Sequence, residues 1–234
     1  MSKKIALVFG GSRGIGAACV ETLAQDGFDV ALTYVANPPS GGGGKAYRVE
    51  ITEPDEVAKV FADVARDLGG APNCVVANAG INVPPGPVAL FDRDNFRRLV
   101  EVNIVGAFNI LAEAARQVAD GGTIIALTTS LVRVSAPGLG PYSATKAAVE
   151  SLVRAMSKEL AGRGVRVNAV APGPTDTDLF RAGKDEAALA RSAALSPFNR
   201  VGQPQEIAEV VRFLASDKSS WVHGQIVQPN GGLV

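Results

Sequence analysis

The amino-acid sequence predicts an α/β fold with a doubly wound parallel sheet between two helix layers, for two reasons. Short apolar runs rich in β-branched residues alternate with segments of helical period along the whole chain. These runs do not alternate polar with apolar residues, which is typical of strands buried on both faces. No repeat or break in composition marks a second unit. We therefore expect one Rossmann-like, three-layer domain spanning residues 1–234.

Strands are expected at residues 5–9, 29–35, 46–50, 73–77, 123–127, 165–170 and 225–228. Apolar steps of three and four between Phe96 and Val118 predict one long helix. Thr52, followed by Pro54 and Asp55, predicts the start of another helix that runs to about Leu68.

The connection between the second and third strands breaks this alternation. Residues 38–45 are prolines and glycines with one serine and one lysine, whereas a parallel crossover of this kind normally carries a helix. We expect this crossover helix to be missing and the third strand still to pair at the sheet edge. Apolar side chains there are expected to be exposed or covered by a neighbouring subunit, and mobility is expected to peak over residues 40–45.

Composition and charge exclude several classes of protein. The chain has 234 residues, 47% of them hydrophobic, and 23 basic residues balance 23 acidic ones. With this balance the chain has no net positive charge that would attract nucleic acid or anionic lipid. No apolar run approaches the roughly 18 residues that span a membrane, and the run near Met1 is too short for a signal peptide. With two cysteines, Cys19 and Cys74, and one histidine, neither a disulfide framework nor a metal site is expected. We expect a cytoplasmic domain without nucleic-acid or membrane partners.

A glycine-rich loop, Gly10 to Gly16, follows the first predicted strand and precedes a helix. Glycines let backbone N–H groups approach a pyrophosphate, and a helix N-terminus favours its charge. The spacing is G-x-x-x-G-x-G, and no Gly-Lys-Ser/Thr of a Walker loop follows. The second strand ends without the acidic residue that binds the ribose of NAD, whereas Arg13 can meet a 2′-phosphate, which favours NADP. The alternatives are an ordinary strand-to-helix turn and a solvated loop cation.

Polar residues also gather near the end of the fifth predicted strand. Tyr142 and Lys146 are four residues apart and share one helix face, where an ammonium favours ionisation of the phenol. Thr128, Thr129 and Ser130 close the fifth strand at its carboxyl end, where open α/β sheets place their sites. Asn103, a poor helix former within the long predicted helix, is either a kink or core amide or a polar relay.

Taken in order, these motifs resemble the short-chain dehydrogenase/reductase family, nearest to its 3-oxoacyl carrier-protein reductase and hydroxynaphthalene reductase branches. The resemblance rests on the loop at 10–16, Asn78-Ala79-Gly80, Asn103, Tyr142 with Lys146, the run from Pro172 to Thr177, and the ending Gly224-Gln225 with Asn230-Gly231-Gly232. It implies hydride transfer between NADP(H) and a ketone or secondary alcohol. The cofactor-binding residues it implies are Gly10, Ser12, Arg13, Gly14, Ile15, Gly16, Tyr34, Glu50, Ile51, Asn78, Ala79, Gly80, Tyr142, Lys146, Pro172, Gly173, Pro174, Thr175 and Thr177.

The resemblance also implies roles for single residues. Tyr142 protonates the substrate oxygen, Lys146 holds the nicotinamide ribose, and Asn103 serves a water relay. Thr177 binds the carboxamide, and Glu50 stands where the family usually has an aspartate near the adenine. A hydroxyl from residues 128–130 polarises the carbonyl: the spacing to Gly122 and Tyr142 selects Thr129, whereas residue type selects Ser130.

Two further positions depart from the family pattern. Phe9 replaces the threonine that usually precedes the first glycine, so a hydroxyl contact to the loop is expected to be lost. Ala77 replaces the first asparagine of Asn-Asn-Ala-Gly. A non-catalytic NADP sensor or scaffold with a reductase fold is the alternative to a ketoreductase; the missing crossover helix favours it, whereas intact Tyr142, Lys146 and Asn103 argue against it.

Two expectations concern partners. Residues 178–200 should form a substrate lid whose apolar side chains, among them Leu179 and Phe198, suggest a carbonyl substrate with a hydrophobic body. The helices expected at 95–119 and 143–160 carry more apolar surface than one sheet face needs. We therefore expect a homotetramer or homodimer. His223, the single histidine, is expected to be structural.

Overall fold

The computed structural model describes residues 4–39 and 43–234 of the chain. Its sheet has seven parallel strands in the order β3-β2-β1-β4-β5-β6-β7. The strands are β1 (Ile5–Phe9), β2 (Asp29–Tyr34), β3 (Lys45–Arg48), β4 (Cys74–Ala77), β5 (Thr123–Leu127), β6 (Arg166–Val170) and β7 (Ile226–Val227). The predicted doubly wound sheet is confirmed. The strand order reverses between β1 and β4, so their carboxyl ends flank the position where such sheets bind ligands.

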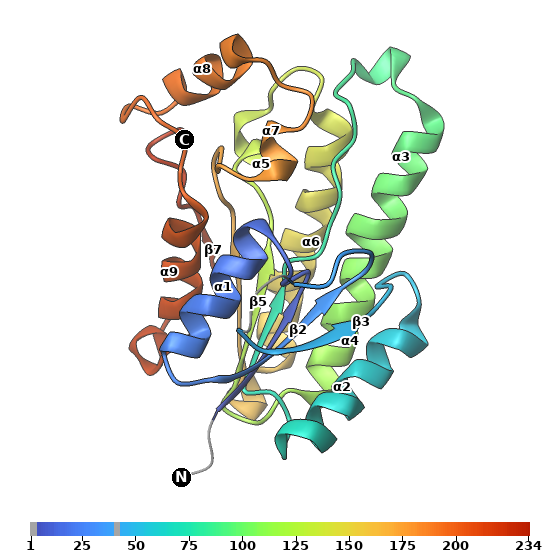
Figure 1. Cartoon of the computed structure of the whole chain (residues 1–234), viewed down its shortest axis with the longest axis vertical. Coiled ribbons are helices and arrows are strands. Elements are labelled where there is room, and N and C mark those ends of the chain that lie inside the picture. The colour runs from blue at the N-terminus through green and yellow to red at the C-terminus, as the bar shows by residue number, and fades with distance from the viewer. Residues whose placement is uncertain (1–3, 40–42) are drawn as a thin grey trace.

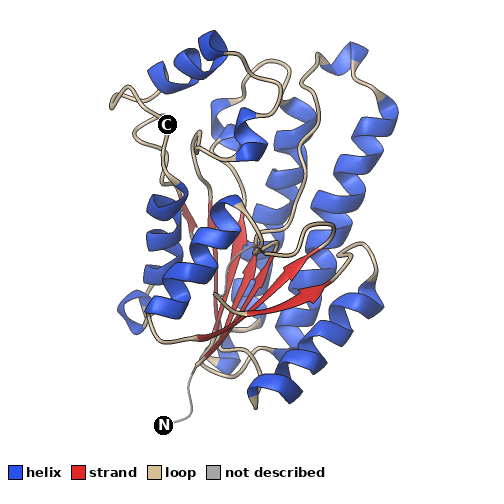
Figure 2. Cartoon of the chain, in the orientation of Figure 1, coloured by secondary structure: helices blue, strands red, loops and turns tan. Residues whose placement is uncertain are grey.

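Helices cover both faces of the sheet (Figures 1 and 2). One face carries α1 (Gly14–Gln25) and α9 (Pro204–Ala215), and the other carries α2 (Pro54–Leu68), α4 (Ala107–Gln117) and α6 (Gly140–Glu159). The remaining helices are α3 (Arg93–Val100), α5 (Leu131–Val134), α7 (Asp178–Arg181) and α8 (Glu186–Ala194), with 3₁₀ turns η1 (Val88–Leu90), η3 (Ala161–Arg163) and η4 (Asp217–Ser219). Three of these helices, α5, α7 and α8, lie beyond the carboxyl ends of the strands (Figure 1).

The two sides of β1 belong to two separate hydrophobic cores. Ile5, Leu7 and Phe9 pack with α2, α4 and α6, whereas Ala6 and Val8 pack with α1 and α9. All five side chains are buried, and this alternation is the period of two that a strand imposes. Burying one large apolar side chain contributes about 1.5–3 kcal/mol, so the strand is fixed between the layers from both sides.

The predicted long helix is interrupted by a π-helical turn, η2 (Glu101–Gly106), between α3 and α4. Asn103 lies in this turn and is fully buried. Its side-chain amide donates to Ile81 O and its oxygen accepts from Ile81 N, both at 2.9 Å. The predicted long helix is thus present from Arg93 to Gln117 but contains a π-helical turn, as the kink interpretation of Asn103 expects, because the turn widens where Asn103 bonds to a neighbouring loop.

The start of α2 also differs from the prediction. Glu53, not Thr52, is the N-cap residue, and its side chain makes no capping hydrogen bond. Pro54 occupies the first helical position, where its missing N–H costs nothing. Glu56 of the first turn accepts from Glu50 N at 2.7 Å, which ties the segment before the helix to its first turn.

The strand at the sheet edge, β3, pairs with β2 although no helix connects them through the described part of the linker, residues 38–39 and 43–45. The predicted pairing is thus confirmed, while residues 40–42, where mobility was expected, lie outside the described residues. Val35 is 46% exposed and Ala46 is exposed, as expected for an uncovered edge. On the opposite face Asp67 of α2 anchors the strand, accepting from Tyr47 Oη at 2.9 Å and pairing with Lys45 Nζ at 2.7 Å.

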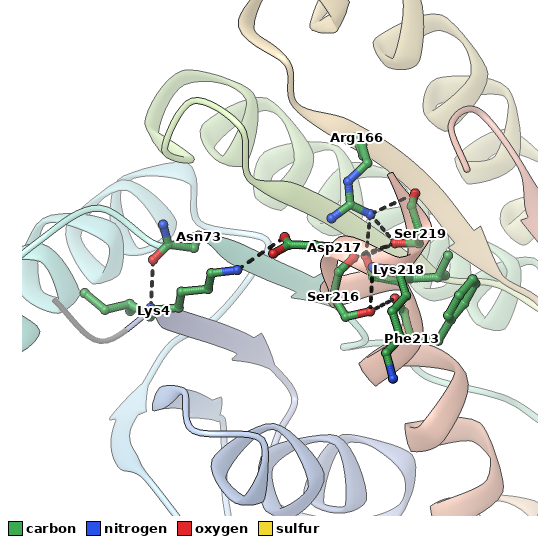
Figure 3. A network of polar contacts seen from close by, with 10 residues as sticks. Lys4, Asn73, Arg166, Phe213, Ser216, Asp217, Lys218 and Ser219 are labelled. Carbon is green, nitrogen blue, oxygen red and sulfur yellow. Dashed lines mark hydrogen bonds and ion pairs between the residues drawn. The ribbon is translucent and has the colours of Figure 1, made fainter. Parts of the chain in front are cut away.

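The amino ends of β1 and β6 are tied to the same turn, η4, at the base of the molecule (Figure 3). The Arg166 guanidinium at the start of β6 donates to Leu214 O at 2.7 Å and to the hydroxyl of Ser219. Lys4 pairs with Asp217 at 3.4 Å, which joins the start of β1 to the same turn. These bonds leave the opposite end of the sheet for function. No helix within the described ranges has the length and apolarity needed to cross a membrane.

Candidate active site

The glycine loop between β1 and α1 has a backbone that only glycine accommodates at two positions. Gly10 has a φ of +70°, and a Cβ there would lie 2.9 Å from Ala79 Cα. A Cβ on Gly16 would lie 2.1 Å from Gly10 O. The first turn of α1 carries no acidic residue, and its N-cap, Arg13, makes no side-chain cap. The N–H groups of this helix start are therefore placed to receive an anion.

A hydroxyl from the neighbouring strand holds this loop. Thr33 of β2 accepts from Gly10 N through its Oγ1 at 3.1 Å, and its carbonyl accepts from Gly11 N at 3.0 Å. The expected loss of a hydroxyl contact at Phe9 is thus corrected: Thr33 supplies the contact. Phe9 instead lies fully buried in the core, its ring centroid 5.8 Å from that of Phe61.

The loop also receives support from the strand on its other side. Asn78, directly after β4, donates through Nδ2 to Gly10 O at 2.9 Å and to Phe9 O at 3.3 Å. Its role is structural in this conformation. The glycine loop is therefore fixed between β2 and β4, at the position where the strand order reverses.

A cavity of about 370 Å³ opens over this loop. Twelve of the residues predicted for the cofactor line it: Gly10, Ser12, Arg13, Gly14, Ile15, Tyr34, Glu50, Ile51, Asn78, Ala79, Gly80 and Thr177. The prediction missed nine lining residues, each within three positions of a predicted site residue: Thr33, Val35, Ala36, Asn37, Val49, Ile81, Val102, Asp178 and Leu179. Arg13 is the one basic side chain among the described lining residues.

The other predicted cofactor residues lie outside the wall of this cavity. Gly16 lies behind the loop, Gly173 packs against Asn230, and Pro174 lines a second, smaller cavity. Pro172 accepts from Ser130 N at 2.9 Å, and Thr175 forms an isolated bridge with Gly202. Thr177, in contrast, lines the cavity and also caps α7 by accepting from Phe180 N at 3.1 Å.

Tyr142 and Lys146 occupy one face of α6, as predicted, and Lys146 meets the cavity wall at Gly80. A Cβ on Gly80 would lie 3.3 Å from Lys146 Nζ. Lys146 donates to Leu127 O at 3.1 Å. Burial lowers the pKa of Lys146 to about 8 and raises the pKa of Tyr142 to about 12. The expectation that the Lys146 ammonium favours ionisation of this phenol was therefore wrong for this conformation, because burial of the phenol raises its pKa and Lys146 does not offset that effect.

The amide of Asn103 lies at the same glycine as Lys146 and contacts α6 at Thr145. A Cβ on Gly80 would lie 3.1 Å from its Oδ1, and its Nδ2 contacts Thr145 Oγ1 at 3.3 Å. Its side chain also makes two hydrogen bonds to the backbone of Ile81. In this conformation Asn103 is therefore a buried amide at a kink in the helix, which is one of the two roles expected for it.

The two candidate hydroxyls at the end of β5 differ in environment. Ser130 is fully buried, and its Oγ donates to Ala171 O at 2.7 Å. Thr129 is 7% exposed, and its Oγ1 accepts from Leu131 N at 3.3 Å. The proton of Ser130 is therefore used inside the fold, whereas no described residue accepts the proton of Thr129.

The remaining polar candidates are structural. His223 accepts from Val167 N through Nδ1 at 3.1 Å, and its Nε2 contacts Ser157 O, so both ring nitrogens are engaged. Burial raises the pKa of the Cys19 and Cys74 thiols to about 12. Across residues 4–39 and 43–234, no three His, Cys, Asp or Glu side chains gather as a metal site would need.

Comparison with known proteins identifies the family. A family profile described as enoyl-(acyl carrier protein) reductase matches residues 10–234. A short-chain type dehydrogenase/reductase of Picea abies is 39% identical over 251 residues, covering 99% of this chain and 92% of that relative. The chain belongs to the short-chain dehydrogenase/reductase family. The resemblance noted in its sequence is thereby confirmed.

Two further relatives of this short-chain dehydrogenase/reductase have informative names. The NADPH-dependent aldehyde reductase-like protein, chloroplastic, of Arabidopsis thaliana is 38% identical and covers 100% of this chain and 95% of its own length. The crystal structure of a short-chain dehydrogenase from Burkholderia cenocepacia in complex with NADP has a TM-score of 0.89 at 30% identity. That alignment covers 100% of this chain and 98% of the Burkholderia chain.

Proposed function

We propose that this chain is an NADP-dependent oxidoreductase that transfers hydride between NADPH and the carbonyl of a ketone, giving a secondary alcohol. The contact that carries this proposal is that of Lys146 with Gly80, because it joins the Tyr142 and Lys146 face of α6 to the glycine-lined cavity. The names of the Arabidopsis relative and of the Burkholderia complex support the same cofactor.

The residues of the cavity fit this cofactor. The crowded glycines leave room for a pyrophosphate against the start of α1, and Arg13 supplies a cation for a 2′-phosphate. No acidic residue occurs over the cavity-lining stretch from Thr33 to Asn37, where a ribose 2′-hydroxyl would need one. When bound, NADPH supplies the hydride. Glu50 and Ile51 would border the adenine, Lys146 would hold the nicotinamide ribose, and Thr177 would bind the carboxamide.

The chain's own residues supply the proton. Tyr142, whose pKa is raised to about 12 by burial, donates its phenolic proton to the carbonyl oxygen as negative charge develops there. The Lys146 ammonium stabilises the phenolate that remains. Thr129 donates a hydrogen bond to the same oxygen, and Ser130 keeps its bond to Ala171 O. A water relay at Asn103 would replace the proton, and it would need the amide to release a bond that it makes to Ile81 in this conformation.

The rest of the domain shapes the substrate site. Within a single domain, residues 178–200 act as its lid, and Leu179 lines the cavity while 45% exposed. Phe198 is 72% exposed near the other end of the lid. These side chains favour a carbonyl compound with a hydrophobic body. A homodimer or homotetramer and a cytoplasmic location remain predictions.

Oxidation of NADPH with a panel of apolar ketones tests the proposal. In Tyr142→Phe, turnover should fall by about 100-fold or more while NADPH affinity is retained, because the phenol acts only in the transition state. Tyr47→Phe is the matched control, since its phenol bonds to Asp67 at the sheet edge. Turnover of Tyr142→Phe within a few-fold of wild type contradicts the assignment. Tight NADPH binding without turnover of any carbonyl favours the sensor or scaffold.

A further inference from the structure

A buried carboxylate that the proposed reaction does not use lies on the catalytic face of α6. Glu150 comes four residues after Lys146 and eight after Tyr142, so the three side chains share one helix face. The Glu150 side chain is only 2% exposed. A buried charge is costly unless it is paired and hydrogen-bonded, so its partners indicate what it does.

All the close partners of this carboxylate flank the candidate hydroxyl of Thr129. Arg133 of α5 donates through Nη1 to Glu150 Oε1 at 2.7 Å and to Oε2 at 2.6 Å. The Thr128 hydroxyl lies 3.3 Å from Oε1 and 3.4 Å from Val170 O, so its one proton is shared between these two acceptors. Arg154, which is more exposed, reaches Oε2 only at 3.8 Å. Glu150 therefore ties both ends of the segment 128–133 to α6.

The opposite side of this segment is fixed to β6 and the residues after it. Thr128 N donates to Val170 O at 2.8 Å, and Ser130 bonds to Ala171 O and Pro172 O. These bonds set the distance of the segment from the sheet but not its position relative to α6. The following helix, α5, has four residues and is too short to be stable alone.

We propose that Glu150 is a positioning residue that, through Thr128 and Arg133, holds the Thr129 hydroxyl in register with Tyr142. The inference rests on the proposed function, since it gives Thr129 a carbonyl oxygen to bind. It adds a pair that acts on the reaction without touching substrate or cofactor. A displacement of about 1 Å at a reacting group can cost roughly 100-fold in rate, so such a pair has a measurable effect.

Two variants separate positioning from plain stability. Glu150→Gln keeps the size of the side chain but sets an amide NH₂ group against the guanidinium or the Thr128 hydroxyl. The double variant Arg133→Met with Glu150→Leu replaces the ion pair with apolar groups of similar volume, which often preserves stability. Asp120→Asn is the matched control, because it breaks the 2.7 Å pair with Arg163 near the opposite end of β5.

For each variant, kcat, KM, NADPH Kd and Tm are measured together with hydrogen exchange of amides 129–134. We expect both Glu150 variants to lose about 10- to 100-fold in kcat with NADPH Kd within about two-fold, and to exchange these amides faster. The double variant should keep the low kcat even where its Tm equals that of wild type. Asp120→Asn should leave kcat and the exchange of these amides unchanged.

Recovery of kcat together with Tm in the double variant would overturn the proposal, since the pair would then serve stability alone. Unchanged exchange of amides 129–134 in Glu150→Gln would overturn it too, whatever the activity. A wild-type chain that reduces no carbonyl contradicts the proposed function instead, and the exchange measurement still decides whether Glu150 holds this segment.

Discussion

The hydroxyl of Thr33 offers a sharp test of how the glycine loop is held. Thr33→Val keeps the shape of a side chain that is 1% exposed but removes the oxygen that accepts from Gly10 N at 3.1 Å. The N–H of a half-buried glycine then has no acceptor. The backbone bond from Gly11 N to Thr33 O at 3.0 Å is retained, so the loop loosens at one point only.

The magnitude follows from the lost bond. An unsatisfied neutral donor costs about 1–3 kcal/mol, and a half-buried one lies toward the lower end, at about 1–2 kcal/mol. For a chain of this size each kcal/mol lowers Tm by about 2–4 °C, so we expect a decrease of about 2–8 °C. Because Gly10 lines the cofactor cavity, NADPH affinity should also fall. A loss of 1.4 kcal/mol in the free energy of NADPH binding corresponds to an increase in Kd of about 10-fold.

Thermal unfolding and fluorescence titration with NADPH measure both effects. Thr33→Ser is the control, because it keeps the hydroxyl and should retain most of the NADPH affinity. A Thr33→Val variant with the Tm and the NADPH Kd of wild type would refute the reasoning, since the hydroxyl would then do nothing for the loop.

Three further predictions concern other parts of the molecule. Arg13→Ala should weaken NADPH binding by about 10- to 100-fold and NADH binding much less, since a charge-assisted phosphate bond contributes about 1.5–3 kcal/mol; equal losses in the two titrations would show that Arg13 only supports the loop. Hydrogen bonds from Lys45, Arg66 and Tyr47 hold the pKa of Asp67 well below its usual range, so the stability this carboxylate contributes is complete above its unfolded pKa of about 3.9 and is lost as pH falls further. The Tm difference between wild type and Asp67→Asn should therefore be constant from pH 7 to 5 and shrink below about pH 4, and a difference that does not change with pH contradicts this. Phe108, 52% exposed on α4, belongs to the apolar face expected to pair with a second copy; Phe108→Glu should give monomers in sedimentation velocity at micromolar concentration, and a wild-type chain that is itself monomeric would count against this.

Features that depend on local sequence were predicted well. The ends of the strands were predicted within one or two residues. A continuous run of β-branched residues between two helical segments is typical of a parallel strand that is buried on both faces. The glycine loop and the Tyr142 and Lys146 pair were found because their spacing along the chain is itself the signal. The missing crossover helix followed from prolines and glycines that cannot form one.

Features that depend on contacts between distant segments could not be predicted. Thr33 lies 23 residues after Gly10, and nothing near Thr33 in the sequence indicates that its hydroxyl faces the loop. The π-helical turn at Asn103 forms because Ile81, from another loop, offers both a donor and an acceptor. Glu150 resembles any other glutamate in an amphipathic helix until α5 is placed beside it. In each case one partner was visible in the sequence and the other was not.

The short edge strand β3 has a consequence for how copies of this chain meet. An edge strand has a neighbour on one side only, and its free backbone groups can pair with a strand of another molecule. Without a crossover helix, nothing in the described linker shields this edge. The strand is four residues long; Arg48 is exposed within it, whereas the ammonium of Lys45 is paired with Asp67 at 2.7 Å. The shortness of the strand and the single Arg48 charge, rather than cover by a helix, therefore limit the pairing of two such edges into aggregates.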